Sequence, residues 1–317
     1  MVCRSLRRPS AHARSERLPR RGVRAPSRCL ALLAAAVELA RRLVGQHTAS
    51  PLIVPLVTAI AIWCEPVFAT LHFGQINLLI MVLVLWDFSR APDARGRGVA
   101  LGLATALKVT PAIFVVYLLL IRRFRFAATA IGAFTCLAVV SIAVRPHDTV
   151  RYWTSLVFDT RRVGNLANPA NQSLRGVLVR AAHQLNLGFT ATAMIAVAAV
   201  LGLACSARAY RQRGEAWGLC AAAVTGLLVS PVSWSHHWVW CVPIAVLFVT
   251  ASPAASWRTR GILGVACLVF VSYRVSAMVP SHQLRNLHMS PVAQLDAVPY
   301  VLFGVLFLAL AALRRSP

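Results

Sequence analysis

The stretch AWGLCAAAVTGLLV (216–229), SPVSWSHHW (230–238) and VWCVPIAVLFVT (239–250) places a polar cluster between two apolar runs. Uninterrupted apolar runs of this kind are typical of helices inside a membrane. Two adjacent histidines, His236 and His237, are costly in hydrocarbon, and polar groups at such positions in membrane proteins mark functional sites. We therefore expect residues 230–238 to lie in a wet cavity or at a membrane surface.

The rest of the chain has the same character. Of its 317 residues, 58% are hydrophobic and only 13% are charged, which is the composition of a polytopic membrane protein. At about 20 residues per span, the length predicts an all-α protein with about 8–10 hydrophobic segments, some of them half-helices. The formal net charge of +24 does not indicate a nucleic-acid-binding protein. Its arginines gather in residues 1–28 and in short loops between apolar runs, which is the pattern of cytoplasmic loops in membrane proteins.

The pattern of apolar residues gives the expected segments. Residues 1–28 are basic and rich in Ser and Pro, so we expect disorder, and a short helix should follow at 29–43. The remaining predicted segments are Pro51–Phe73, Ile76–Phe88, Val99–Leu107, Pro111–Ile121, Phe126–Val144, Phe189–Arg208, Ala216–Trp234, His237–Thr250, Gly261–Val279 and Val298–Leu313.

Arginine groups set the orientation, because Lys and Arg are enriched in cytoplasmic loops. We expect the following groups to be cytoplasmic: Arg90/Arg95/Arg97, Arg122/Arg123/Arg125, Arg208/Arg211/Arg213, Arg258/Arg260 and Arg314/Arg315.

The first two arginine groups flank the segment Val99–Ile121, which is interrupted at Lys108–Pro111. Two cytoplasmic flanks predict a hairpin of two short helices whose tip lies at membrane depth, where irregular backbone must line protein or a cavity. A single long span is the alternative. With this orientation, residues 144–188, 230–237 and 280–299 lie outside, so the polar motifs converge on the external face.

Lys108 is the only lysine, and it lies between two apolar half-helices. It either holds a phosphate as a point charge or extends to the membrane interface. His236 and His237 either bind phosphate, sugar or metal, or belong to an aromatic belt with the neighbouring tryptophans. Adjacent histidines on a helix point about 100° apart, so they suit two partners better than one ion.

Amide side chains form two further candidate groups. Asn171, Gln172 and Arg175 lie in an external loop, where they either contact a phosphorylated sugar or make turn and capping bonds. Gln75 and Asn77 lie at an apolar turn, where they either line a cavity or form hydrogen bonds between helices.

Acidic residues are scarce in the apolar region. Glu65 is an intramembrane acid that we expect to pair with Lys108 or an arginine, and Asp159 is an external carboxylate expected to be a solvated loop charge. The chain contains no Gly-rich phosphate loop, GxSxG or HExxH motif, and its eight cysteines form no CxxC pair. We predict no metal and no cofactor.

Together these motifs resemble glycosyltransferase family 87, a group of actinobacterial membrane mannosyltransferases of the GT-C type. The resemblance covers about residues 51–313 and is carried by four stretches in the same order: LHFGQINLL (71–79), GLATALKVTP (102–111), NQSLRG (171–176) and SPVSWSHHW (230–238).

This resemblance implies a GT-C-like fold, a polyprenyl-phosphate-mannose donor and a mannoside glycolipid acceptor. Transfer would occur at the extracytoplasmic face of the plasma membrane, with a carboxylate as general base and inversion at the anomeric carbon. The chain would thereby extend envelope glycolipids or lipoglycans. It also implies that Lys108, Arg175, His236 and His237 line the active cavity and stabilise the leaving phosphate, without a nucleotide.

In such enzymes the catalytic aspartate follows the first span, and residues 1–50 contain no such span and loop. We therefore expect an N-terminally truncated member, weakly active or inactive, with residues 1–28 as a basic segment that is either genuine or spurious and 29–317 as the transferase domain. The catalytic residue is unknown, and Glu65 and Asp159 are the first acids to test. The alternatives are a lipid-linked sugar flippase or transporter and a non-catalytic membrane protein.

Overall fold

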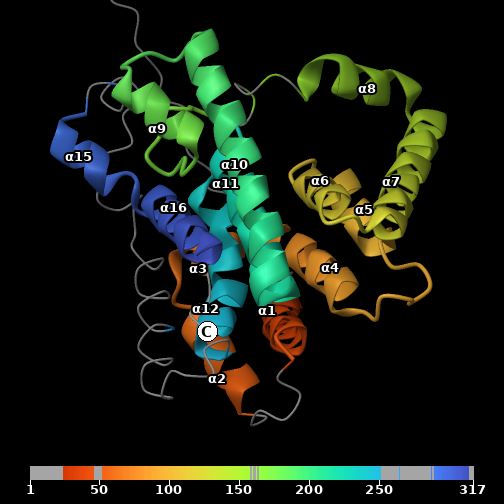
Figure 1. Cartoon of the computed structure of the whole chain (residues 1–317). Coiled ribbons are helices and arrows are strands. Elements are labelled where there is room, and N and C mark those ends of the chain that lie inside the picture. The colour runs from red at the N-terminus through yellow and green to blue at the C-terminus, as the bar shows by residue number, and fades with distance from the viewer. Residues whose placement is uncertain are drawn as a thin grey trace, which may run out of the picture.

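The computed structural model describes residues 24–45, 52–157, 159, 162, 164–250, 264, 287 and 289–313. Within these residues the regular structure is helical, so the predicted all-α class is confirmed. Figure 1 shows the helices and their connections. Their bounds are α1 Arg24–Leu43, α2 Ile53–Ala61, α3 Glu65–His72, α4 Asn77–Ser89, α5 Val99–Leu107, α6 Ala112–Leu120, α7 Phe124–Val144, α8 Pro146–Arg151, η1 Tyr152–Leu156, α9 Leu174–Ala181, α10 Phe189–Arg213, α11 Glu215–Val229, η3 Ser235–Trp240, α12 Cys241–Thr250, α15 Pro291–Asp296 and α16 Pro299–Ala312.

Two helices, α7 and α10, are each long and apolar enough to cross a membrane by themselves. Both expose apolar side chains, such as Val139 on α7 and Val200 on α10, as expected of surfaces that face lipid. Several other apolar helices in the described residues are shorter, including α4, α11 and α16. The chain is therefore a membrane protein in which short helices pack beside longer ones.

One predicted span is broken. Pro51–Phe73 was expected to be continuous, but α2 and α3 meet at an angle of 74° after a three-residue break. Cys64 is extended (φ −67°, ψ 131°), and Pro66 lies in the first turn of α3. Proline has no backbone N–H to donate, so it favours the start of a new helix over continuation of the old one.

The segment between the first two arginine groups forms a hairpin. Arg97, just before α5, and Arg123, just after α6, both contact the carboxylate of Glu215, at 3.6 Å and 2.6 Å. Both ends of the segment therefore lie at one place, which a straight span would not allow. The hairpin prediction is confirmed, and Lys108–Pro111 forms its tip.

Three of the predicted cytoplasmic groups gather on one face, which we call the arginine-rich face. Besides its ion pair with Glu215, Arg123 donates a hydrogen bond to the Tyr210 hydroxyl at the end of α10. Arg208 and Arg213 donate to the last carbonyls of α16. Arg258/Arg260 and Arg314/Arg315 lie outside the described residues.

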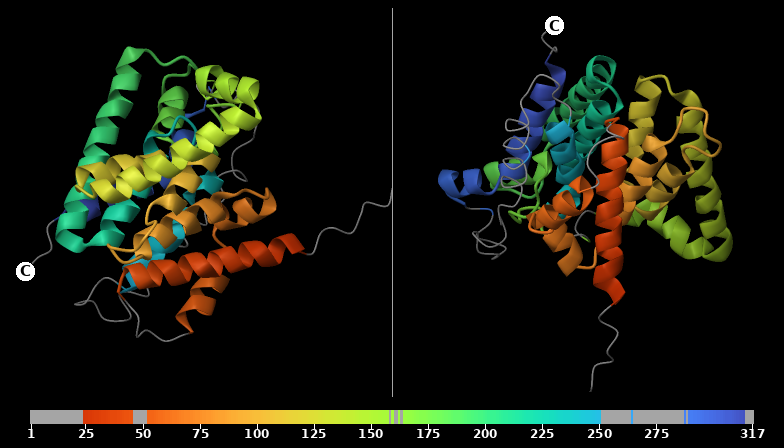
Figure 2. Two further views of the ribbon diagram at one scale, coloured as in Figure 1. Left: turned by 90° about the vertical axis from the view of Figure 1, so that its right-hand side faces the viewer. Right: turned by 90° about the horizontal axis from the view of Figure 1, so that it is seen from below.

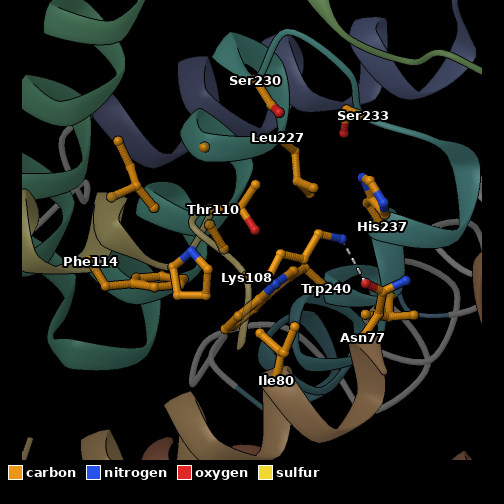
Figure 3. A pocket seen from close by; sticks show the side chains of 15 residues that line it. Asn77, Ile80, Lys108, Thr110, Phe114, Leu227, Ser230, Ser233, His237 and Trp240 are labelled. Atoms are coloured by element: carbon orange, nitrogen blue, oxygen red, sulfur yellow. Dashed lines mark hydrogen bonds between the residues drawn. The ribbon is translucent and has the colours of Figure 1, made fainter. Parts of the chain in front are cut away.

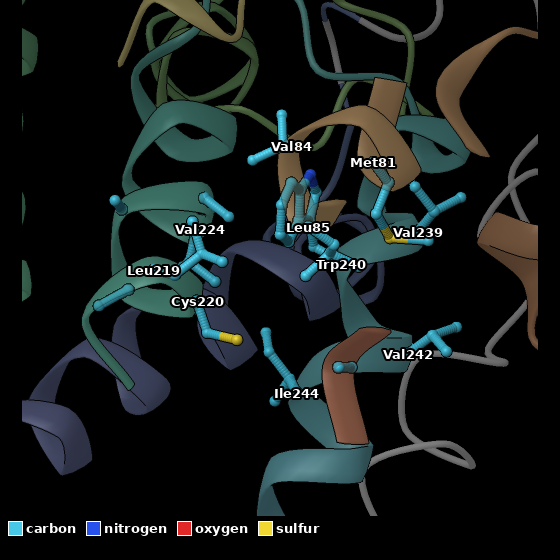
Figure 4. Close-up of a cluster of buried hydrophobic side chains, with 14 of the residues drawn as sticks. Met81, Val84, Leu85, Leu219, Cys220, Val224, Val239, Trp240, Val242 and Ile244 are labelled. Atoms are coloured by element: carbon cyan, nitrogen blue, oxygen red, sulfur yellow. The ribbon is translucent and has the colours of Figure 1, made fainter. Parts of the chain in front are cut away.

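The core lies between α1, α4, α11, η3 and α12. Figure 4 shows α4 side chains such as Met81 and Leu85 facing Leu219 and Val224 of α11 and Ile244 of α12. Figure 2 (right) shows α1 between the group formed by α5, α6 and α7 and the group containing α15 and α16. This arrangement brings the ends of α3, α5 and α11 close to η3.

Several boundaries differ from prediction. Helix α1 begins at Arg24, five residues before the predicted start, and α10 extends to Arg213. The predicted spans 216–234 and 237–250 are separated by a short 3₁₀ helix, η3, which carries both histidines. Residues 1–23 and almost all of the predicted segment Gly261–Val279 lie outside the described residues.

Candidate functional site

An open cavity of about 470 Å³ lies at the tip of the α5–α6 hairpin, and we call it the polar cavity. The tip supplies Lys108 and Thr110, the α3–α4 turn supplies Gln75, and η3 supplies both histidines. The opposite wall comes from η1 and the residues after it. The lining residues are Gln75, Leu107, Lys108, Val109, Thr110, Tyr152, Leu156, Val157, Asp159, Arg162, Ser230, Pro231, Val232, Trp234, His236 and His237.

Lys108 ends α5 in an extended conformation (φ −156°, ψ 131°), which turns its side chain out of the helix. Its Nζ donates to the Asn77 side-chain oxygen at 3.0 Å, and the Asn77 amide donates to the His236 carbonyl at 2.9 Å. Thr70 donates to the same carbonyl at 3.0 Å. Figure 3 shows the Lys108 ammonium between Asn77 and His237. The cation is thus tied to the histidine segment.

His236 and His237 both line the polar cavity. Their ring centroids are 4.8 Å apart and the rings are nearly perpendicular, at 89°. Among the described residues, no group of three or more His, Cys, Asp or Glu side chains is placed to hold a metal ion.

The pair Gln75 and Asn77 divides between its two predicted roles. Gln75 is exposed in the turn after α3 and lines the polar cavity. Asn77 is only 5% exposed and connects Lys108 with His236. Gln75 is therefore a cavity residue, whereas Asn77 forms hydrogen bonds between segments and also lines a smaller adjoining pocket with Lys108 and His237 (Figure 3).

Asp159 and Arg162 lie on the opposite wall, and Arg162 was not among the predicted site residues. The Arg162 guanidinium lies over the Tyr152 ring, 5.9 Å from its centroid, and donates to the Leu156 carbonyl at 2.7 Å. The loop thus brings a second cation and a carboxylate to a cavity that already contains Lys108. The sequence alone does not single out Arg162 as a site residue, because its loop contains several charged residues.

The predicted substrate contacts at Asn171 and Gln172 need correction. Both side chains are 0% exposed and neither lines the polar cavity. The Asn171 amide donates to the Leu166 carbonyl at 3.1 Å, and its oxygen accepts from the Ser233 N–H at 2.9 Å. The side chain is occupied by backbone partners, so it holds the histidine segment against the external loop.

The Gln172 side chain, like that of Asn171, forms hydrogen bonds through both its amide nitrogen and its oxygen. Its amide donates to the Pro169 and Ala297 carbonyls, and its oxygen accepts from the Tyr300 N–H. Its backbone carbonyl accepts from the Trp238 indole at 3.2 Å. Gln172 therefore links the external loop to the start of α16, which corrects its predicted contact with substrate.

Arg180 was missed by the sequence analysis, although it is only 1% exposed. Its guanidinium donates to the carbonyls of Asn168 and Asn171, at 3.1 Å and 3.2 Å, and to that of Ala297 at 3.1 Å. The available signal was an arginine inside the apolar stretch VLVRAA (177–182). This residue closes the same loop that Asn171 and Gln172 hold.

Arg175 also departs from its predicted place. It lies in the first turn of α9, is not among the residues that line the polar cavity, and its buried Nε has no partner among the described residues. The expectation that it lines the cavity is therefore not supported by its position.

Among the described residues, Glu65 has a partner that the sequence did not predict. Its carboxylate is 5% exposed and accepts a hydrogen bond from the Tyr300 hydroxyl. Because Glu65 does not line the polar cavity, its contact instead connects α3 with α16.

Comparison with known proteins decides the family. The model of glycosyltransferase family 87 matches residues 24–231, about two thirds of the chain. The chain belongs to glycosyltransferase family 87. The match starts before the region 51–313 that the motifs indicated, and it ends just before the two histidines.

Curated members of family 87 extend the comparison. A polyprenol-phosphate-mannose-dependent α-(1-2)-phosphatidylinositol pentamannoside mannosyltransferase of Mycobacterium tuberculosis is 36% identical over 80% of this chain and 59% of its own length. A phosphatidylinositol mannoside mannosyltransferase of the same species is 35% identical over 83% and 61%, respectively. The corresponding enzyme of Mycolicibacterium smegmatis is 37% identical over 72% and 54%. The chain spans about three fifths of the length of the curated relatives it matches. No solved structure matches it significantly.

Proposed function

We propose that this family 87 chain is a membrane α-mannosyltransferase that uses polyprenyl-phosphate mannose. The observation that carries the proposal is the polar cavity, in which Lys108, Arg162, His236 and His237 surround a space next to a carboxylate. The names of its relatives support the donor and the transferred sugar. The proposed transferase domain comprises residues 29–317.

The donor phosphate binds near Lys108. The ammonium is oriented by Asn77 and lies on the same cavity wall as the two histidines. Fixed cations and N–H donors stabilise the charge that develops on a departing phosphate, and they do so most effectively where water is largely excluded. Arg162 on the facing wall supplies a second cation. This arrangement needs no nucleotide.

The proposed reaction is a displacement at the anomeric carbon. The acceptor hydroxyl gives its proton to a carboxylate as its oxygen forms the new bond, and the bond from the anomeric carbon to the phosphate oxygen breaks with inversion. Polyprenyl phosphate leaves with the electron pair. Asp159 is the carboxylate among the described residues that line the polar cavity, so we assign it as the base.

Similarity to the curated relatives suggests the acceptor, and the distribution of arginines suggests the side of the membrane on which the reaction occurs. The relatives act on phosphatidylinositol mannosides, so we propose a mannoside glycolipid as acceptor. The arginine-rich face lies at the base of the hairpin and the polar cavity at its tip. Because arginine-rich loops favour the cytoplasm, we propose that the cavity opens toward the extracytoplasmic side of the plasma membrane.

The test is transfer of labelled mannose by the purified full chain in lipid nanodiscs. We expect transfer from polyprenyl-phosphate mannose to a phosphatidylinositol mannoside, and loss of most of it in Lys108→Gln. Arg95→Gln is the matched control, because this exposed residue carries the same charge on the opposite face. Donor movement across vesicles without transfer would identify a flippase, and equal transfer by both variants would remove the assigned role of Lys108.

A further inference from the structure

A second cavity, of about 240 Å³, lies where α5 and α7 meet α8 and η1. Its lining is mainly apolar and includes Ala106 and Phe134, and Asp148 and Thr149 of α8 add polar groups to it. Figure 1 shows α8 turning away from the end of α7, above α5 and α6. A mainly apolar pocket with a few polar groups at defined places is the usual form of a small-ligand site.

Three aromatic rings give this second cavity a fixed shape. The Trp153 ring meets Phe134 edge-on, with centroids 5.6 Å apart at 89°, and meets Tyr152 in the same way, at 5.2 Å and 87°. Perpendicular aromatic contacts of this kind are favourable and hold the rings in place. Among the described residues, the Trp153 indole N–H has no hydrogen-bond acceptor, so the half-buried ring keeps one donor available to a ligand.

The residues of α8 that line the second cavity supply hydrogen-bond acceptors. Asp148 has a side chain that is 69% exposed, and it lies 3.8 Å from Arg145 and 3.6 Å from His147. Such long, exposed ion pairs contribute little and leave carboxylate oxygens accessible. An ionised carboxylate only accepts hydrogen bonds, so its natural ligand partners are hydroxyl and N–H groups.

Tyr152 lines both cavities. Arg162 lies over its ring from the side of the polar cavity, so the tyrosine is held between the two spaces. A ligand in the second cavity is therefore a direct neighbour of the site where, on the proposed function, the acceptor hydroxyl attacks.

We propose that the second cavity binds a hexose of the acceptor glycan, the one next to the sugar that receives mannose. This inference rests on the proposed transfer reaction and adds a subsite for its acceptor. A hexose has apolar C–H faces that pack on aromatic rings and hydroxyls that bond to carboxylates. Trp153 and Tyr152 provide the first kind of partner, and Asp148 provides the second.

A hydrocarbon chain is the rival occupant, because the lining is mainly apolar. A chain that filled the cavity would place hydrocarbon against the Asp148 carboxylate and the Trp153 N–H, and desolvating polar groups without new partners is unfavourable. A hexose satisfies these groups. The sugar is therefore the occupant that the lining favours.

The test compares two acceptors in nanodiscs, octyl α-mannoside and its α-linked dimannoside, at saturating donor. In the wild-type chain we expect a lower KM for the dimannoside. In Trp153→Ala we expect that KM to rise about tenfold, because roughly one aromatic contact and one hydrogen bond are lost, with the monomannoside KM and the donor KM unchanged. Trp63→Ala is the control, since Trp63 is 79% exposed and lies outside the cavity.

Asp148→Asn, with Asp93→Asn on the opposite face as control, should shift the dimannoside KM in the same direction. An unchanged dimannoside KM in Trp153→Ala would overturn the proposal and leave the ring as part of an aromatic belt. A changed donor KM would overturn the proposal and indicate that the prenyl chain of the donor occupies the second cavity.

If the wild-type chain transferred no mannose, the proposed function would fail separately. Saturation-transfer NMR would then decide the subsite by itself. Contact between the protein and the dimannoside that is lost in Trp153→Ala supports it, and contact retained in that variant excludes it.

Discussion

The ammonium group of Lys108 donates a 3.0 Å hydrogen bond to the side-chain oxygen of Asn77. The amide of the same asparagine donates to the His236 carbonyl. One buried side chain therefore connects the tip of a hairpin inside the protein with the segment that carries both histidines. The positions of the cation and of the imidazoles in the polar cavity depend on each other through this residue.

Replacing Asn77 should destabilise this connection. Asn77→Leu leaves the Lys108 ammonium and the His236 carbonyl each without one partner, and a buried polar group that loses its partner costs about 1–3 kcal/mol. We expect the free energy of unfolding to fall by about 2 kcal/mol in denaturant titrations in detergent. Thr70→Val removes one of the two donors to the same carbonyl and should cost about 1 kcal/mol. Equal stability of Asn77→Leu and wild type would show that the network contributes nothing.

Glu215 should stabilise the base of the α5–α6 hairpin. Glu215→Gln removes the charge that Arg97 and Arg123 share, and Arg97 is only 7% exposed. Because breaking a buried ion pair leaves an uncompensated charge, we expect a loss of about 2–4 kcal/mol in the free energy of unfolding.

The matched control is Glu38→Gln, which also removes two arginine partners, Arg41 and Arg42. That cluster lies within two turns of one helix and is more exposed, so its loss should cost less than about 1 kcal/mol. A larger loss in Glu38→Gln than in Glu215→Gln would contradict the anchoring role.

The hairpin was one of two structures that the sequence allowed. Arginines on both sides of Val99–Ile121 favour both ends on one face, and Lys108 with Pro111 marks the break, but only the folded structure decides against a single long span. The lining residues Lys108, His236 and His237 were predictable, since polar groups inside apolar runs need a cavity.

Other parts of the site could not be read from the sequence. An amide in a loop has the same local pattern whether it contacts a substrate or a backbone carbonyl, so the sequence left both alternatives open for Asn171 and Gln172. Their partners, Ser233, Ala297 and Tyr300, are distant in the chain, and only the folded structure brings them together.

Arg180 should be essential for the stability of the external loop. It donates to three backbone carbonyls from a position that is 1% exposed. Arg180→Ala removes the donor of the Asn171 carbonyl and one of two donors to each of the Asn168 and Ala297 carbonyls, and we expect a loss of about 3 kcal/mol in the free energy of unfolding. Arg180→Lys keeps the charge but lacks the fork that reaches several acceptors, so it should recover less than half of the loss.

Arg175→Ala is the control for Arg180, because it removes the same group from the same helix. With no partner for its buried Nε among the described residues, Arg175 should cost less than about 1 kcal/mol to remove. A similar loss in Arg175→Ala and Arg180→Ala would indicate a general effect of arginine on α9 instead of the three bonds.

Substitutions of Asp159 and of Glu65 should have different effects, because the two acids have different roles. Asp159 lines the polar cavity, whereas Glu65 accepts from Tyr300 away from it. If Asp159 takes the proton of the acceptor hydroxyl, Asp159→Asn should lower kcat by about 10²–10⁴-fold and leave donor affinity unchanged. Glu65→Gln keeps an oxygen for the Tyr300 hydroxyl, so its kcat should stay within about twofold of wild type. Undiminished kcat in Asp159→Asn would exclude Asp159 as the base.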